Sequence, residues 1–406
     1  MKGKWVLGGF LLLGCGALES LDLSVLKGKR PASISVFSEY ENSQCRLEAA
    51  LKTSHVACAT LQKMATGKHP ACYGENTPLR GFFPHKPNKP IYLCPKGGER
   101  DLSEGFRGRE RLRFFVMGDI GKGEDSLRGY GQEKVSQLLS FLCHEGEKCD
   151  FGLVTGDLIY PKGVSSVFDG KLEVFFEDMY KDLSQFPFYL VAGNHDHLGN
   201  IKAALEYSYF SEMWRFPSLY YKVPFLPSWL SIFALDTSSF ISGESHYLSE
   251  VEQFQAARRA LCGKEGFRVA FGHHPPDSSG KHKGNVEIKS FLTRLHKECS
   301  LDSYFAGHEH HQEHLRVDGY DVFVQGAGGT KIRSVVHKLE PHRQRFALAA
   351  HGFMIVDASK DEMVVRFYSA DAFGYRDGEF AKRPSLKDFF YRCRLVRGGE
   401  DGCLSF

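Results

Sequence analysis

Five apolar runs in this chain of 406 residues each end in glycine followed directly by a side chain that can bind a metal ion. Carboxylate and amide oxygens mixed with imidazole nitrogens suit iron, zinc or manganese better than calcium or copper(I). With one shared carboxylate, such a set is large enough for two metal ions, and a metal pair bridged by hydroxide can hold a phosphate and activate the attacking water. The residue types therefore predict phosphoester hydrolysis. In chain order the candidate ligands are Asp119, Asp157, Asn194, His273, His308 and His310.

The apolar runs alternate with helical patterns from Arg111 onward, which predicts an α/β fold with strands buried on both faces. Ligands of open α/β sheets bind outside the carboxyl ends of the strands, so the five loops are expected to converge on one rim. Strands are expected within 112–119, 150–157, 187–194, 229–236, 267–273, 303–307, 320–325 and 352–368. Helices are expected through Leu138 and over 172–183, 249–262 and 286–297.

Each motif alone has an ordinary structural explanation. A Gly-Asp pair after a strand is common in turns, and His273 with His274 could be a surface pair. His308 and His310 are harder to explain in this way, because residues two apart in an extended segment lie on one face. All five motifs in order, each after an expected strand, favour a functional site.

The order of these motifs, GD…GD…GNH…GH…GHxH, resembles that of the calcineurin-like metallophosphoesterases. Gly156–Tyr160, GDLIY, is similar to the GDxxY of the purple acid phosphatases. The segments 193–200, 214–223 and 232–237 resemble the small, tartrate-resistant type within that group. The resemblance covers residues 111 to 370 and implies a four-layer α/β/β/α sandwich.

The resemblance also implies roles for individual residues in an acid phosphatase that hydrolyses phosphate monoesters with a metal-bridging hydroxide. His195 would lie near the leaving-group oxygen, and His282 falls where the family has a second substrate histidine. Two positions depart from the mammalian pattern: Ile120 replaces a tryptophan and His274 a tyrosine. The implied ligands are Asp119, Tyr160 and His310 for a ferric ion, Asp157 as the bridge, and Asn194, His273 and His308 for a divalent iron, zinc or manganese ion.

Three alternatives stay open. A phosphodiesterase would use the same metal centre. A metal- or phosphate-binding surface lipoprotein would have lost turnover, although the intact His195 argues against this. Finally, residues 25–108 could be an interaction module that carries the phosphatase.

The N-terminus predicts export. Lys2 and Lys4 precede a nine-residue apolar stretch that is too short to span a bilayer and has the order of a signal peptide. Leu12–Cys15 resembles the bacterial lipobox, so residues 1–15 are expected to be a signal peptide ending in a lipidated Cys15. We therefore expect a periplasmic or cell-surface protein attached to a bacterial outer membrane, with plain secretion as the alternative.

The remaining ten cysteines fit an exported, disulfide-bonded chain. By proximity, the expected pairs are Cys143 with Cys149, Cys262 with Cys299 and Cys393 with Cys403. The other four, Cys45, Cys58, Cys72 and Cys94, could connect in three ways. They belong to a cysteine-rich N-terminal extension, 25–108, which precedes the expected phosphoesterase domain, 109–370, and a disulfide-bonded tail, 371–406.

The composition excludes other classes of protein. A chain with 42% hydrophobic and 13% aromatic residues is globular. A formal net charge of +3, with no basic stripe and no interleaved aromatics, predicts no nucleic-acid partner. The oligomeric state is not predicted.

Overall fold

The structure is a computed structural model that describes most of the chain after residue 105. The described ranges are 106–121, 130–145, 148–166, 169–209, 211, 213–241, 250–337, 339–340, 342–376, 378–397 and 401–405. The expected signal peptide, Cys15 and almost all of the segment 25–108, with its four cysteines, lie outside these residues.

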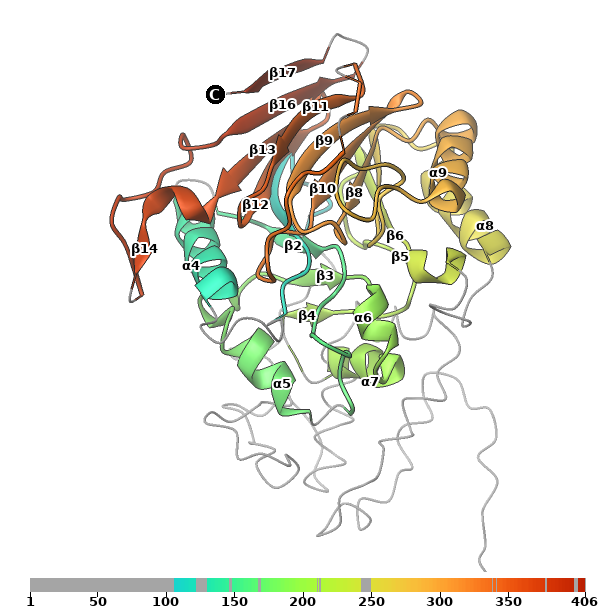
Figure 1. Cartoon of the computed structure of the whole chain (residues 1–406). Helices are drawn as coiled ribbons and strands as arrows, with labels where there is room; N and C mark the ends of the chain where they lie inside the picture. The colour runs from blue at the N-terminus through green and yellow to red at the C-terminus, as the bar shows by residue number, and fades with distance from the viewer. Residues whose placement is uncertain are drawn as a thin grey trace, which may run out of the picture.

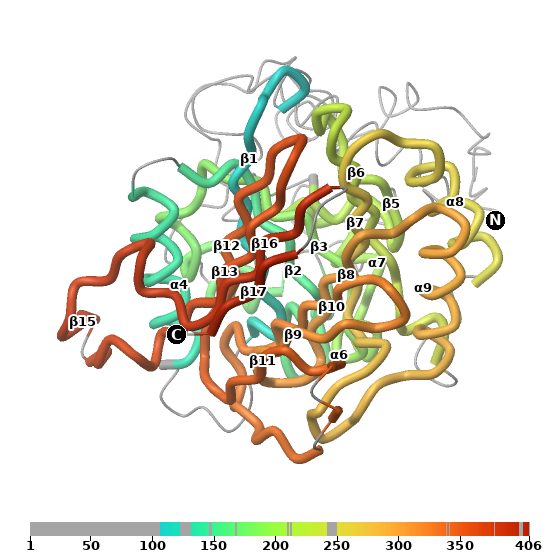
Figure 2. Tube along the Cα trace, turned by 90° about the horizontal axis from the view of Figure 1, so that it is seen from above, coloured from blue at the N-terminus to red at the C-terminus, as the bar shows by residue number. Residues whose placement is uncertain are grey.

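Two large β-sheets form the centre of the described chain, with helices on both outer sides (Figure 1). The first sheet has the strand order β17-β16-β13-β12-β1-β2-β3-β4, and the second has the order β11-β9-β10-β8-β7-β6-β5. Seen from above, α4 lies outside the first sheet, and α8 and α9 lie outside the second (Figure 2). The described residues thus form the four-layer α/β/β/α sandwich that the resemblance implied.

The first sheet has a parallel half and an antiparallel half, which meet at β1. Strand β1 pairs in parallel with β2 and antiparallel with β12. Strands β16 and β17 extend the antiparallel half, so the sheet continues past the expected boundary at residue 370. The strands are β1 (Arg111–Met117), β2 (Phe151–Val154), β3 (Phe188–Leu190), β4 (Trp214–Arg215), β12 (Gly352–Ser359), β13 (Glu362–Ser369), β16 (Tyr391–Val396) and β17 (Gly402–Ser405).

The centre of the second sheet is parallel, because β6 pairs with β7, β7 with β8 and β8 with β10 in this way. The pairs at its edges are antiparallel. Its strands are β5 (Tyr221–Lys222), β6 (Leu230–Ala234), β7 (Phe267–Phe271), β8 (Ser303–Ala306), β9 (Gln312–Val317), β10 (Tyr320–Gln325) and β11 (Gln344–Leu348). A short separate hairpin joins β14 (Tyr375–Arg376) to β15 (Glu379–Phe380).

The α-helices are α4 (Tyr130–His144), α5 (Gly170–Leu172), α6 (Asn194–His197), α7 (Ile201–Glu206), α8 (Glu250–Leu261) and α9 (Val286–Cys299). Short 3-10 turns span Lys181–Leu183, Tyr207–Tyr209, Thr237–Phe240 and Ala370–Phe373. None of the helices in the described ranges has the length and apolar character that crossing a membrane requires.

Burial explains why the predicted strands form. All four residues of β2 are buried, as expected for a parallel strand covered on both faces. Between the sheets, the rings of Phe114 in β1 and Phe305 in β8 meet edge to face, with centroids 6.3 Å apart. A second apolar cluster packs α8 and α9 against the outer face of the second sheet. The two sheets are therefore held face to face, and their strand-end loops meet at one rim.

The single helix expected over 172–183 is wrong in detail. The segment forms α5, a π-helical stretch at Glu173–Glu177 and a 3-10 turn. Phe176 lies at its centre and packs against Phe188 and Trp214, with ring centroids 5.4 and 4.8 Å apart. Tertiary packing of this kind overrides helical periodicity.

The three disulfides expected from proximity are confirmed. Cys143–Cys149 joins the end of α4 to the start of β2, Cys262–Cys299 joins the ends of α8 and α9, and Cys393–Cys403 crosses from β16 to β17.

Candidate metal centre

The loops that follow β1, β2, β3, β7 and β8 meet at one end of the two sheets. Backbone hydrogen bonds join them directly: Asp119 N donates to Gly156 O over 2.9 Å, and Gly307 N donates to His273 O over 2.8 Å. The convergence expected from the strand order is therefore present.

The first ligand group surrounds the hydroxyl of Tyr160. This oxygen lies 3.0 Å from Asp119 Oδ1, 2.8 Å from Asp157 Oδ2 and 3.3 Å from His310 Nε2. His310 Nε2 is also 3.3 Å from Asp119 Oδ1. Asp119, Tyr160 and His310 are the residues that the resemblance assigned to a ferric ion, and Asp157 is the one that it assigned as the bridge.

The second group surrounds Nε2 of His273. This nitrogen lies 3.1 Å from Asn194 Oδ1, 3.2 Å from His308 Nδ1 and 3.4 Å from Asp157 Oδ1. The two carboxylate oxygens of Asp157 thus face different groups, which is the position that a bridging ligand requires.

The donor set fits two cations. His273 Nδ1 lies 2.8 Å from Thr155 O and His310 Nδ1 lies 2.8 Å from Lys331 O, so each ring can donate its Nδ1 hydrogen and turn the Nε2 lone pair inward. Metal-binding histidines are held in this way. Metal–ligand distances of about 2.0–2.2 Å separate neighbouring ligands by about 3 Å, as observed here.

The electrostatics of the protein alone agree with this fit. Burial lowers the pKa of His273, but the carboxylates of Asp157 and Asp119 outweigh it and raise that pKa. Burial, then the same two carboxylates, raises the pKa of the Tyr160 phenol well above its ordinary value. The site thus concentrates negative charge, which a metal cation would compensate.

The backbone is strained at three of the candidate ligands. Asp119, Asp157 and His308 have φ of 55°, 50° and 67°, in the left-handed region that side chains other than glycine rarely adopt. Such residues cluster at functional sites, because the surrounding structure must hold them there.

Two of the preceding glycines are needed for close approach. A Cβ at Gly193 would lie 2.1 Å from Asp157 Oδ1, and one at Gly156, whose φ is +89°, would lie 2.7 Å from His273 Nδ1. Each of these two glycines therefore makes room for a ligand of a neighbouring loop.

His195 lies at the edge of the first group, with its ring centroid 4.5 Å from that of Tyr160. Its Nδ1 is 2.6 Å from Pro161 O, and its Nε2 is 4.0 Å from Asp157 Oδ2. The side chain is 31% exposed. A hydrogen on Nδ1 is thus held by a carbonyl, while Nε2 faces the centre and can exchange protons with a substrate.

His282 lies beside the second group, with its ring centroid 4.7 Å from that of His308. Its Nε2 is 2.6 Å from Nη1 of Arg333. A guanidinium only donates, so in this arrangement the imidazole accepts and is neutral. Burial, then Arg333, lowers the pKa of His282.

Arg333 was missed by the sequence analysis. It belongs to the loop after β10, and its backbone N donates to His310 O over 3.0 Å. Strand β10 pairs in parallel with β8, so the loops after both strands leave from the same end of the sheet. The glycine-rich stretch 326–329 at the end of β10 was therefore the available signal for this loop. Within the described ranges, its guanidinium makes no ion pair with a carboxylate.

Asp196 fastens two of the loops together. Its buried carboxylate accepts hydrogen bonds from the backbone N of Leu158 at 3.1 Å, of Ile159 at 3.3 Å and of Gly193 at 2.8 Å. Burial, then Asp157, raises its pKa to about 6. Its position shows a structural function between the Tyr160 loop and the His195 turn.

Other residues without an expected function also support the loops. His197 Nε2 lies 2.9 Å from Asp236 Oδ1, and His311 Nε2 lies 3.2 Å from Glu313 Oε2. Thr237 Oγ1 accepts from the backbone N of His273 and His274 and lies 3.0 Å from His274 Nδ1.

Known proteins share this fold and these motifs. The profile described as calcineurin-like phosphoesterase matches residues 112–312. Tartrate-resistant acid phosphatase type 5 of Homo sapiens is 31% identical over 284 residues, which cover 64% of this chain and 87% of that protein. Purple acid phosphatase 3 of Arabidopsis thaliana is 29% identical over 288 residues, which cover 65% of this chain and 75% of that protein.

Among solved structures, one similar fold is that of GAP50, described as the anchor in the inner membrane complex of Plasmodium. The match has a TM-score of 0.53 and 20% sequence identity, and it covers 68% of this chain and 88% of that chain. At this identity the similarity concerns the fold alone. The profile and the two relatives carry the assignment further: the chain belongs to the calcineurin-like phosphoesterases, among the tartrate-resistant and purple acid phosphatases.

Proposed function

We propose that this protein is an acid phosphatase that hydrolyses phosphate monoesters with an Fe(III)–M(II) pair, where M is iron, zinc or manganese. The observation that carries the proposal is the Tyr160 hydroxyl, placed within 3.3 Å of Asp119, Asp157 and His310. A phenol has an ordinary pKa near 10, so it binds as phenolate only beside a strongly acidic cation such as Fe(III).

When bound, the metal pair supplies an activated water and positive charge for the phosphoryl oxygens. The protein supplies the remaining steps. Pro161 O orients His195 so that Nε2 can deliver a proton to the leaving oxygen. Arg333, beside His282, offers a guanidinium to the phosphate from the side of His308.

The non-catalytic alternative needs a direct test, because the fold is shared with a protein described as an anchor. Two observations favour turnover: all seven candidate ligands converge, and His195 stands beside them with Nε2 facing the centre. A phosphodiesterase would use the same ligands. Assaying a bulky diester beside a monoester separates these two activities.

The decisive experiment combines metal analysis with a visible spectrum. We expect a pink to purple protein that contains iron and a second metal and is active at mildly acidic pH. Tyr160→Phe should bleach the band while iron remains bound. Tyr180→Phe is the matched control, because Tyr180 is also fully buried but contacts Gln132 rather than a ligand. A colourless wild type with two zinc ions, or a band that survives Tyr160→Phe, would contradict the Fe(III) assignment.

We also propose that the protein is exported and anchored through a lipidated Cys15. The three disulfides of the described chain support export, because such bonds persist in oxidising compartments.

A further inference from the structure

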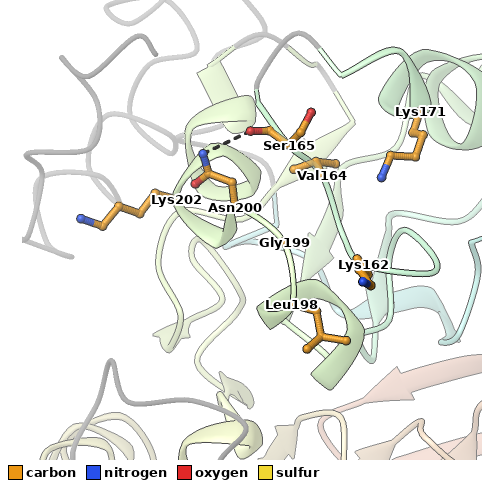
Figure 3. Close-up of a pocket in the computed structure, with 8 residues that line it drawn as sticks. All are labelled: Lys162, Val164, Ser165, Lys171, Leu198, Gly199, Asn200 and Lys202. Atoms are coloured by element: carbon orange, nitrogen blue, oxygen red, sulfur yellow. Dashed lines mark hydrogen bonds between the residues drawn. The ribbon is translucent and has the colours of Figure 1, made fainter. Parts of the chain in front are cut away.

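A hollow of about 600 Å³ opens beside the loops that carry Tyr160 and His195. Figure 3 shows Lys171 and Lys162 on one side of it and Lys202 on the other, with the amine of Lys202 directed outward. The side chains of Asn200 and Ser165 lie between them. Small-molecule sites have volumes of about 300–1,000 Å³, so the hollow has the size of a ligand subsite.

The floor of the hollow continues directly from the metal centre. Pro161, whose carbonyl oxygen holds His195, is followed by Lys162, and Asn200 N donates to Val164 O over 2.7 Å. A Cβ at Gly199 would lie 2.3 Å from Lys162 O, so the two loops are in close contact. A group in the hollow would thus lie alongside the two loops that carry Tyr160 and His195.

The hollow is positively charged. Among the described residues that line it, three are lysines and none carries a carboxylate. Lys171 is partly compensated, since its amine bonds to Gly163 O and lies 3.5 Å from Asp169 Oδ2. Lys162 and Lys202 are exposed, and neither pairs with a carboxylate among the described residues. Two ammonium groups without a carboxylate partner in the described part of the chain therefore border the hollow.

We propose that this hollow binds a second phosphate group of the substrate. This inference rests on the proposed phosphatase activity and specifies its substrate class: small phosphate esters that carry two or more phosphates. Lysine is a compact point charge that suits a freely oriented phosphate, and the side chains can turn inward on their flexible stems. The reaction is unchanged, because the second phosphate is held and not cleaved.

The test is the double variant Lys162→Gln/Lys202→Gln in the full-length holoenzyme. Fructose 1,6-bisphosphate and p-nitrophenyl phosphate serve as probes with and without a second phosphate. We expect kcat/KM for the bisphosphate to fall about fivefold to twentyfold, the range for two partly screened charge pairs, with less than a twofold change for p-nitrophenyl phosphate. The difference should shrink at high salt.

Lys264→Gln/Lys297→Gln is the matched control, because it removes the same charge from exposed positions at and near the ends of α8 and α9. An equal loss in this control, or an unchanged kcat/KM of the hollow variant for the bisphosphate, would overturn the subsite. So would a loss confined to a phosphopeptide, which would indicate a macromolecular substrate.

A binding measurement separates this inference from the proposed function. Inositol hexasulfate is a polyanion without a phosphate ester, and its affinity can be measured by calorimetry whether or not the protein turns over. We expect it to bind the Lys162→Gln/Lys202→Gln variant about fivefold to twentyfold more weakly than the wild type. Equal affinities would overturn the hollow as an anion site, whereas absent phosphatase activity with this difference intact would overturn only the proposed function.

Discussion

Replacing Glu313 by glutamine is expected to destabilise the protein and loosen the loop that carries His282. The carboxylate is fully buried in β9. Its Oε2 atom accepts a hydrogen bond from Ser278 Oγ at 2.8 Å and lies 3.2 Å from His311 Nε2. Its Oε1 atom accepts from Gln344 Nε2 at 2.6 Å and from the hydroxyl of Ser279. The backbone N of Ser279 donates to both oxygens over 3.2 Å. Glu313 therefore anchors the segment 275–285 to the second sheet.

The magnitude follows from these contacts. Glutamine keeps the shape of the glutamate side chain but loses its negative charge. Its NH2 group would also face groups that donate to Glu313 and cannot accept from the amide, such as the backbone N of Ser279 and Nε2 of Gln344. Hydrogen bonds to charged groups contribute about 1.5–3 kcal/mol, and the two serine hydroxyls can rotate to accept, so we expect a loss of about 2–4 kcal/mol. In a large domain this lowers the melting temperature by about 4–8 °C. KM for a phosphate ester should also rise, because the His282 loop is less fixed.

The effect should depend on pH in a defined direction. Burial alone would raise the pKa of Glu313, but the hydrogen bonds from His311, Ser279 and Ser278 outweigh it and lower that pKa below the ordinary 4.5. The stabilisation is therefore fully present above pH 4.5 and is lost as the pH falls through the lower folded value. Melting curves from pH 7 to pH 3 should show the wild type and the variant converging in acid.

Glu298→Gln is the control. Glu298 forms ion pairs with Arg258 at 2.9 Å and Arg294 at 2.8 Å, but its side chain is 32% exposed, so its loss should cost less than about 1 kcal/mol. Equal melting temperatures of wild type and Glu313→Gln at pH 7 would refute the anchoring function of Glu313.

Three further changes test the centre and the anchor. His195→Ala should keep both metals and lose about 10²- to 10⁴-fold in turnover, most for poor leaving groups; unchanged rates on an alkyl phosphate would remove His195 from the mechanism. Arg333→Gln should raise KM and the inhibition constant of inorganic phosphate about tenfold or more with little change in metal content, since it removes a charge-assisted contact; an unaltered inhibition constant would show that the phosphate does not reach Arg333. Cys15→Ser should release the processed protein from the membrane fraction, and retention there would exclude the lipid anchor.

The strand-end loops could be predicted because parallel strands share one rim. An apolar run followed by glycine and a ligand is a local pattern, and it located the loops after β1, β2, β3, β7 and β8. The same reasoning stopped at β10, where Gly326 is followed by small residues and no ligand, so Arg333 was missed. Arg333 contacts His282, which lies 51 residues away in the sequence. Such a contact depends on tertiary packing, and no local sequence pattern indicates it.

The polar strand β9 shows a different limit. Its first residues, Gln312, Glu313 and His314, would be expected on a solvent-facing strand, yet all three are fully buried. Their partners come from distant segments: Glu313 meets Ser279 and Gln344, and His314 Nδ1 lies 2.7 Å from the hydroxyl oxygen of Tyr391. Composition marks such residues as polar, and only the fold supplies the donors and acceptors that let them be buried.

Strained backbone conformations coincide with the candidate ligands. Of the described residues other than glycine with positive φ, Asp119, Asp157 and His308 are candidate ligands from three different loops. Each such conformation costs about 1–2 kcal/mol. The hydrogen bond from His308 N to Asp119 Oδ2, at 2.8 Å, fixes two of these residues against each other. Contacts of this kind hold ligand side chains of different loops close together, and a metal cation bound among them would relieve the repulsion between the carboxylates of Asp119 and Asp157.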